Sequence, residues 1–431
     1  MNRIAVLVVL LSALPAGVRA GEDPLGTALE AAKSDAARIR GLEFRADLKV
    51  RKITAEEFRR EIMLRDVRRI FGEGETLIHM EALLRILRVI PSDAGLLDLA
   101  QRFFPATVAA NYDPVTKQIS FIREFTNPAS LHTVMVHELT HALQDQHFDL
   151  LRMVEGQDLD FDRLLALGAL VEGDAESTER TFETAGLLAV TPLETIRALG
   201  RTQVRQYLAR MKDFPPGLAR PFIFQYLDGL LFVETVKRAR GGFPAIDRAY
   251  RDPPVSTEQI LHPGRYLARD HPTTILLEEA PPGYRVLLAN TLGELGLSIV
   301  LAGHIGEEKA ETAADGWDGD RILLLARGEE SPVLVWYTTF DSARDAGEFL
   351  QAAALMLGAR RSAPLEPLGL FTAESLLQRE DGRVAMLLAK GRDVVLIEGA
   401  PEDDSEAFAG ALLKARKREV VVTESSFGSG R

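Results

Sequence analysis

Apolar and polar residues recur along the first two thirds of the chain with the spacing of amphipathic helices. This pattern predicts helices over residues 25–40, 55–71 and 77–90, around 134–143, from about 160 onward, and over most of 192–240. Two apolar runs around Asp113-Pro114 instead predict a β-hairpin, with strands over 108–112 and 118–122. The N-terminal part is therefore expected to be mainly helical.

From about residue 282 the pattern changes to short strands that alternate with helices. Residues 284–305 are predicted to be largely helical. Strands are then predicted at 321–326, 333–340, 370–378, 384–389 and 394–397. Helices are predicted at 342–357 and 403–417. Asp315, Asp318 and Asp320 lack the full ligand spacing of a calcium loop and are predicted to form a polar turn.

Together these patterns predict an α+β protein in which a helix-rich domain precedes a smaller α+β domain. A chain of 431 residues is long enough for two or three domains. The predicted divisions are a signal peptide at 1–20, a helical lead-in region at 21–100, a central domain at 101–275, an α+β C-terminal domain at 282–420 and a disordered tail at 421–431.

The central domain carries the motif H-E-x-x-H, formed by His137, Glu138 and His141 within an apolar run. Residues four apart lie one turn apart on the same helix face, so both imidazoles can bind one metal ion. Glu138 points about 100° away, where it can hold and deprotonate a metal-bound water. The motif indicates zinc hydrolase chemistry, against the simpler alternative of a helix that exposes two histidines.

A catalytic zinc usually takes three protein ligands, so a third ligand is needed. Glu172, in a second predicted helix that starts near Asp160 or Asp162, is the first candidate. Glu176 lies one turn later on the same face and could orient a ligand imidazole. Gly173 and Ala175 are small and favour close helix packing. The ordinary alternative for both glutamates is a solvated acidic helix face.

His147 is the second candidate for the third ligand. His137, His141 and His147 have the ligand spacing of the metzincin pattern H-E-x-x-H-x-x-G-x-x-H. That pattern has glycine where this chain has Gln144, and glycine allows the sharp exit from the helix that the third histidine requires. The sequence therefore favours Glu172, with His147 as a helix cap or a hydrogen-bonding residue of the core.

The motif at 137–141 and the later Glu172-Gly173-Asp174-Ala175 resemble the gluzincin-type metallopeptidases, including the peptidase MA-like and thermolysin-like groups. The resemblance covers about residues 105–190. It implies a zincin-like catalytic domain at 101–275, a zinc ion held by two histidines and a glutamate, and a strand edge that seats an extended peptide. The hairpin is the candidate for this edge, and an ordinary structural hairpin is the equal alternative. The chain also resembles a largely uncharacterised set of exported bacterial proteins. The phrases shared with that set are Tyr112-Asp113-Pro114, residues 141–148, Ser256-Thr257-Glu258-Gln259-Ile260-Leu261-His262-Pro263 and Gly316-Trp317-Asp318-Gly319-Asp320.

Zinc peptidases also need a donor that stabilises the oxyanion opposite the base. His262, Arg265 and Tyr266 form the cluster that the sequence favours, with His262 and Tyr266 as the predicted catalytic residues. A histidine before proline at a helix end is more often a cap, which is the competing interpretation.

Composition bears on location and partners. Residues 1–20 have a basic start, an apolar core and a small-residue cleavage site, so they predict a signal peptide and a periplasmic or secreted product. Removal of Arg3 and Arg19 with this segment leaves 49 basic and 63 acidic residues, a net charge of −14, which makes nucleic acid an improbable partner. The chain has no cysteine, which excludes disulfides and thiolate ligands.

The sequence thus predicts an exported zinc metallopeptidase that cleaves a peptide or protein substrate through a zinc-bound water activated by Glu138, without stable membrane insertion after signal cleavage. The competing hypothesis is a non-catalytic exported binding or assembly protein with a structural or vestigial metal site. Neither the substrate nor the oligomeric state can be inferred from the sequence.

Overall fold

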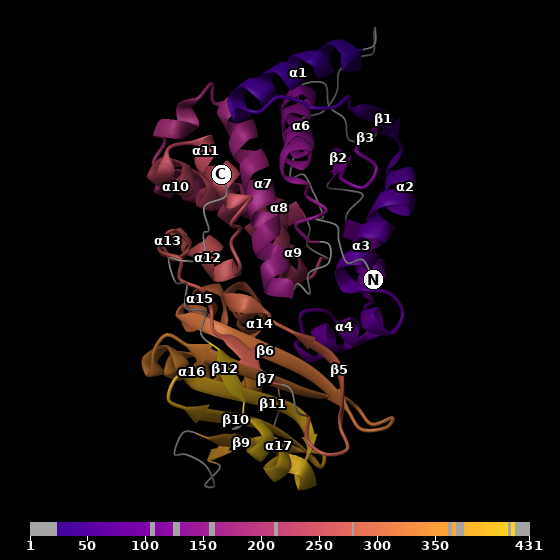
Figure 1. Ribbon diagram of the computed structural model, residues 1–431. Coiled ribbons are helices and arrows are strands. Elements are labelled where there is room, and N and C mark those ends of the chain that lie inside the picture. The colour runs from indigo at the N-terminus through magenta and orange to yellow at the C-terminus, as the bar shows by residue number, and fades with distance from the viewer. Residues whose placement is uncertain are drawn as a thin grey trace. The chain divides into compact units, whose positions relative to one another are not determined.

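The computed structural model describes residues 24–103, 108–123, 130–154, 160–210, 214–277, 280–360, 364–367, 375–412 and 415–418 (Figure 1). The protein has an α+β fold, with a mainly helical N-terminal region and a β-rich C-terminal part, as the sequence predicts. The predicted signal peptide and the predicted disordered tail lie outside the described residues. No helix in the described part of the chain is both long and apolar enough to span a membrane.

The chain forms two compact units. The first unit contains the described residues up to Leu77, those between Ser92 and Leu159, and Leu164–Pro254. The second unit contains Ile78–Pro91, Asp160–Arg163 and the described residues from Val255 onward. The domain limits expected from the sequence, at residues 100 and 275–282, stay predictions.

Helices dominate the first unit. They are α1 (Pro24–Arg40), α2 (Ala55–Phe58), η1 (Arg59–Met63), α3 (Leu64–Phe71), α5 (Leu96–Phe103), α6 (Leu131–Phe148), α7 (Phe161–Glu183, whose first turn groups with the second unit), η3 (Leu187–Val190), α8 (Leu193–Arg210), α9 (Pro216–Ile223), η4 (Phe224–Asp228), α10 (Gly229–Arg240) and α11 (Phe243–Ala249). The predicted helices at 25–40 and 55–71 are present as α1 and as α2, η1 and α3.

A three-stranded sheet completes this unit, in the order β1 (Lys49–Ile53), β3 (Gln118–Ile122), β2 (Ala110–Asp113). β2 and β3 form the predicted antiparallel hairpin, and β1 pairs with β3 in parallel. The sequence did not predict β1, because its five residues, K-V-R-K-I, are too few and too basic to show a strand pattern. Buried side chains of α1, α6 and the hairpin share one hydrophobic core, which holds α6 against the sheet.

The second unit is built on a seven-stranded sheet in the order β5-β6-β7-β11-β10-β9-β8, in which all neighbouring strands are antiparallel. The strands are β5 (Arg285–Asn290), β6 (Trp317–Ala326), β7 (Val333–Phe340), β8 (Glu366–Pro367), β9 (Leu376–Glu380), β10 (Arg383–Lys390) and β11 (Asp393–Pro401). The helices are α4 (Glu75–Ile86, mostly in this unit), α12 (Thr257–Leu261), α13 (Pro263–Ala268), α14 (Gly293–Ile305), α15 (Glu307–Ala314), α16 (Ala343–Arg360), η5 (Glu402–Asp404) and α17 (Ser405–Leu412), and a separate pair of strands is formed by β4 (Thr274–Leu276) and β12 (Arg416–Arg418).

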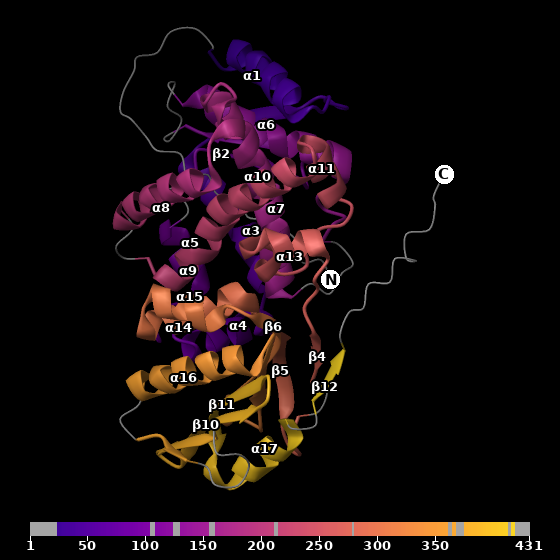
Figure 2. The ribbon, with the colours of Figure 1, turned by 90° about the vertical axis from the view of Figure 1, so that its left-hand side faces the viewer.

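The two faces of this sheet are covered differently. Helix α16 lies on one face, where Phe349 packs against Trp336, and α17 lies on the other, where Phe408 joins the core (Figure 2). The prediction of one helix over 284–305 is wrong in its first part, because residues 285–290 form β5. The segment R-V-L-L-A-N is a short apolar run, and periodicity alone does not distinguish a short buried strand from a helix.

Asp320, near the beginning of β6, accepts several hydrogen bonds within the second unit. Its carboxylate accepts hydrogen bonds from the indole Nε1 of Trp317 (3.1 Å) and of Trp336 (3.0 Å). It also accepts bonds from the backbone N–H groups of Leu292 (3.0 Å) and Gly293 (2.9 Å). The polar turn predicted for Asp315, Asp318 and Asp320 is therefore wrong for the last two residues, which lie in β6.

We expect Asp320→Ala to lower the free energy of unfolding of the second unit by about 3–5 kcal/mol, because four N–H donors, three of them on buried residues, lose their acceptor. Trp317 and Trp336 are the two tryptophans of the chain, so intrinsic fluorescence during urea unfolding reports directly on this site. Asp403→Ala, an exposed change in the same unit, should shift the unfolding free energy by less than about 0.5 kcal/mol. Equal effects of the two variants would show that Asp320 does not stabilise the unit.

Candidate metal centre

Helices α6 and α7 run side by side in the first unit and bring the predicted ligands together (Figure 1). The Oε2 atom of Glu172 lies 3.4 Å from the Nε2 atom of His137 and 3.6 Å from that of His141. Ligand atoms about 2.1 Å from a tetrahedral zinc are separated by about 3.4 Å. His137, His141 and Glu172 thus form a candidate metal-binding group with zinc-like spacing.

Polar atoms at this group are buried and lack partners. His137, His141, Glu172 and Glu138 are each 0% exposed as whole residues. The Nε2 atoms of both histidines, both carboxylate oxygens of Glu172 and Oε1 of Glu138 have no hydrogen-bond partner among the described residues. Buried polar atoms in native proteins are normally paired, so this convergence indicates a place for a cation.

The charge of the group also suits a cation. Burial alone would raise the pKa of Glu172, but the imidazoles of His141 and His137 lower it to about 2. Burial raises the pKa of Glu138. Burial and the carboxylate of Glu176 raise the pKa of Glu179 to about 7. Glu172 is therefore ionised, which is the form in which a carboxylate binds a metal ion.

The second nitrogen of each imidazole is held by a different partner. His137 Nδ1 lies 2.7 Å from Glu179 Oε2, and His141 Nδ1 lies 2.9 Å from Gln144 Oε1. Such partners orient ligand imidazoles and fix the tautomer that leaves Nε2 free for the metal. Glu176, predicted from the sequence to do this, instead pairs with Arg180 at 2.7 Å. Glu179 was missed, although it lies seven residues after Glu172, two turns along the same face.

Gln144 is itself fixed by a buried polar network. Its Nε2 donates to the backbone oxygen of Val171 (3.0 Å) and to Asp174 Oδ2 (3.1 Å), so its Oε1 must face His141. Asp174 is also bound by Arg40 Nε (2.8 Å) and by the hydroxyl of Tyr250 (3.0 Å). Gln144, the residue that departs from the metzincin pattern, therefore orients the imidazole of a candidate ligand, His141.

Two glycines allow α10 to lie against α7. A Cβ atom added at Gly173 would lie 2.2 Å from the backbone carbonyl of Gly229, and one added at Gly229 would lie 2.3 Å from the oxygen of Ala169. The close packing expected from Gly173 is thus present. It brings the segment before Gly229 near the metal-binding group.

We expect Gly173→Ala to lower the free energy of unfolding by about 1–3 kcal/mol and to weaken zinc binding, because the added methyl group pushes α10 from α7 beside Glu172. Thermal unfolding and zinc titration of the full chain measure both effects. Gly303→Ala is the matched control, since a Cβ atom at this helical glycine meets no atom within 4 Å. A Gly173→Ala variant as stable as the control would contradict the packing argument.

The hairpin approaches Glu138 through β2. The backbone N–H of Tyr112 donates to Glu138 Oε2 at 2.5 Å, and the Tyr112 hydroxyl donates to Asp145 on the same helix at 2.6 Å. β2 is an edge strand, as a substrate shelf requires, but Tyr112 is 1% exposed. The N–H of Tyr112 is therefore already bonded to Oε2 of Glu138, and the other oxygen of this carboxylate, Oε1, stays unpaired.

Tyr226 is a residue of the site that the sequence did not reveal. It belongs to the π-helical turn η4, whose type is frequent at functional sites. Its ring stacks on His137, with 6.1 Å between ring centroids. The buried hydroxyl has no well-formed hydrogen bond among the described residues. Burial, together with the carboxylates of Glu172 and Glu138, raises the pKa of Tyr226 well above its usual value, so the phenol stays a donor.

The other predicted site residues are not members of this group. His147 is in the last turn of α6, and its Nε2 lies 2.8 Å from the backbone oxygen of Glu43. Because α6 continues through Gln144, His147 does not turn back to the imidazoles. His262 and Tyr266 belong to the second unit, where His262 Nε2 lies 2.9 Å from Glu294 Oε1. Their role as oxyanion donors stays a prediction.

Comparison with known proteins leaves the reaction open. A family model described as a domain of unknown function (DUF8575) matches residues 285–409. No curated protein matches the chain. Among solved structures, it is similar to one from Chloroflexus aurantiacus described as a "putative hydrolase with a novel fold", at 16% identity and a TM-score of 0.33, over 58% of this chain and 92% of that chain. So low a score carries no argument about fold or activity.

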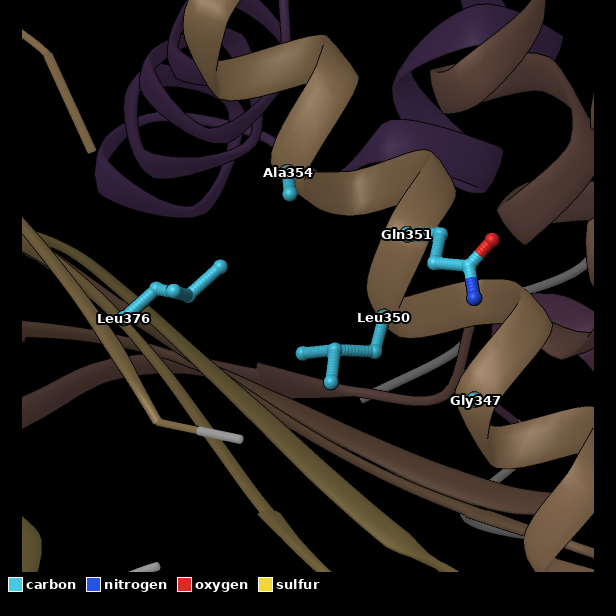
Figure 3. A pocket seen from close by; sticks show the side chains of 5 residues that line it. All are labelled: Gly347, Leu350, Gln351, Ala354 and Leu376. Carbon is cyan, nitrogen blue, oxygen red and sulfur yellow. The ribbon is translucent and has the colours of Figure 1, made fainter. Parts of the chain in front are cut away.

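A separate hollow lies in the second unit between α16 and β9. It is lined by Gly347, Leu350, Gln351, Ala354 and Leu376 (Figure 3). None of these side chains ionises or binds metals. This hollow therefore offers no catalytic group, and the chemistry of the described chain is best sought at the buried histidines.

Proposed function

We propose that the protein is a zinc-dependent hydrolase that cleaves peptide bonds. The observation that carries this proposal is the grouping of His137, His141 and Glu172, with Glu138 next to His137 in the same helix and its Oε1 unpaired; all four residues are fully buried. Three protein ligands leave a fourth zinc position for water, as in catalytic rather than structural sites. The adjacent carboxylate supplies the base that such a site needs.

The residues present fit zinc, since two imidazoles and one carboxylate are a common catalytic ligand set. When bound there, zinc would supply a Lewis acid that lowers the pKa of a water molecule toward neutrality. Glu179 and Gln144 hold the imidazoles in place, and Glu172 remains ionised.

Glu138 moves the proton in this proposal. Its Oε2 is bound to the N–H of Tyr112, so its free Oε1 accepts the proton of the attacking water. The same carboxyl group then gives the proton to the leaving amine. The raised pKa of Glu138 suits a group that must hold a proton between these two steps.

Tyr226 supplies the donor that the sequence sought in His262 and Tyr266. Its buried hydroxyl lies near Glu172 and stays protonated, so it can donate to the carbonyl oxygen as that oxygen gains negative charge. We expect Tyr226→Phe to lower kcat about 10²–10³-fold while the zinc content stays equal to wild type, because loss of one oxyanion donor has this effect. Steady-state assays compare kcat of Tyr226→Phe with that of the matched variant Tyr266→Phe, which is expected to be near wild type. The opposite ranking would favour the residues chosen from the sequence.

Complete burial of the ligands is the observation that favours the competing role, a structural metal in a non-catalytic binding or assembly protein. A structural zinc would have four protein ligands. Within the described residues, this group offers three candidate ligands. The unpaired Glu138 Oε1 and Tyr226 hydroxyl would have no role in a structural site.

The test is metal analysis joined to a broad peptide-library digest of the full chain. We expect one zinc at this centre and the release of peptide fragments, both lost in His137→Ala and His141→Ala and unaffected in His147→Ala. Metal that is bound without any peptide cleavage would favour the structural role. The proposal includes export of the protein, which rests on residues 1–20. It also includes a peptide or protein substrate rather than a nucleic acid, which rests on the acidic composition.

A further inference from the structure

A second cluster of metal-ligand type lies in the second unit, away from the residues used above in the sequence. His262 caps α12, Glu294 is in the first turn of α14, and Asp315 caps the end of α15. Their ligand atoms all lie within 4.8 Å of one another. His262 and Asp315 lie in or next to two sequence phrases, 256–263 and 316–320, for which the proposed hydrolysis has no use.

The separations suit one ion. His262 Nε2 lies 2.9 Å from Glu294 Oε1 and 3.8 Å from Asp315 Oδ1. A metal with bonds of about 2.1 Å separates neighbouring ligand atoms by about 3.0–3.4 Å, depending on the coordination geometry. Small side-chain movements would bring both distances to that value.

An unpaired buried oxygen points to a ligand independently of the acidic cluster. The Glu294 side chain is 7% exposed, and its Oε2 has no hydrogen-bond partner among the described residues. Arg265, the nearby cation, is bonded to Asp270 (2.7 Å) and Asp341, and it lies 3.3 Å from Glu258. Its charge is thus shared among other carboxylates.

We propose that His262, Glu294 and Asp315 bind a divalent first-row transition cation, forming a second metal site. One imidazole nitrogen and two carboxylate oxygens suit zinc or manganese, whereas magnesium and calcium prefer oxygen ligands throughout. The side chains of His262 and Asp315 are 40% and 70% exposed, so this site opens to solvent and leaves positions for water. It is expected to exchange its ion faster than the buried centre.

Zinc titration of the metal-free full chain, with bound metal counted after desalting and by calorimetry, tests this site. We expect two equivalents in the wild type and one in His262→Ala. Asp315→Asn, a mild change at an exposed position, should weaken the second equivalent about tenfold or more. His79→Ala, at another histidine of the same unit, should keep both. Manganese should fill the second site, and magnesium at the same concentration should not.

The outcomes separate the two sites. His141→Ala should also bind one equivalent, but it should keep the one that His262→Ala loses. If the buried centre binds no metal, His141→Ala will not change the count, and His262→Ala still will. Unchanged zinc binding in both His262→Ala and Asp315→Asn would overturn the second site, and so would magnesium binding as tight as that of zinc.

Discussion

Glu138→Gln is expected to keep its zinc and to lose peptide hydrolysis by a factor of about 10²–10⁴, the range that a positioned acid–base group contributes. Glutamine has the size of glutamate, and its amide oxygen can still accept the hydrogen bond from the N–H of Tyr112. It cannot take a proton from water. Structure and metal binding should therefore survive while the proton transfer fails.

Zinc content and the rate of fragment release, measured on the same sample, check this result. Glu194→Gln is a matched control, because Glu194 is an exposed glutamate of the same unit. It should be fully active. Retained turnover in Glu138→Gln would refute the assignment of the base, and loss of zinc in this variant would show that Glu138 acts as a ligand instead.

Glu172→Ala is expected to weaken zinc binding more than about 100-fold. Loss of a residue that only hydrogen-bonds to a metal ligand already weakens metal binding by about 10–100-fold. The substitution removes one of the three candidate ligands, whose carboxylate oxygen lies 3.4 Å and 3.6 Å from the two imidazole Nε2 atoms. Hydrolysis should disappear with the metal. Competition with a chromogenic chelator measures the affinity.

His147→Ala is the control that decides between the two candidate third ligands. In the structure His147 bonds to a backbone oxygen of Glu43 and lies outside the metal-binding group. Its zinc affinity should match wild type. A large loss of affinity in His147→Ala, with Glu172→Ala unaffected, would restore the metzincin-like arrangement.

The sequence predicted the elements and ligands that depend on local periodicity. The helix around 137–141, the hairpin before it and the helix carrying Glu172 each follow from spacing within one segment. Helical spacing also placed Glu172 on a face that could meet the imidazoles, which is the arrangement observed.

Contacts between distant segments could not be predicted in the same way. Tyr226 reaches the site through a π-helical turn and a glycine contact with α7, and neither leaves a periodic signal. Glu179 rather than Glu176 forms a hydrogen bond with His137. Glu179 follows Glu172 by seven residues and lies about 20° from it around the helix, whereas Glu176 follows by four residues and lies about 40° away. The sequence argument about Gln144 considered only its backbone, at the position where the metzincin pattern has glycine. In the structure its side-chain amide oxygen contacts His141.

Complete enclosure of His137, His141 and Glu172 has a kinetic consequence. Local opening around α6, α7 and η4 is expected to admit a substrate and also to let an ion escape, so the residence time of the ion depends on this opening as well as on its bonds. Chelators would strip it slowly at any concentration, and mild denaturant would hasten the loss.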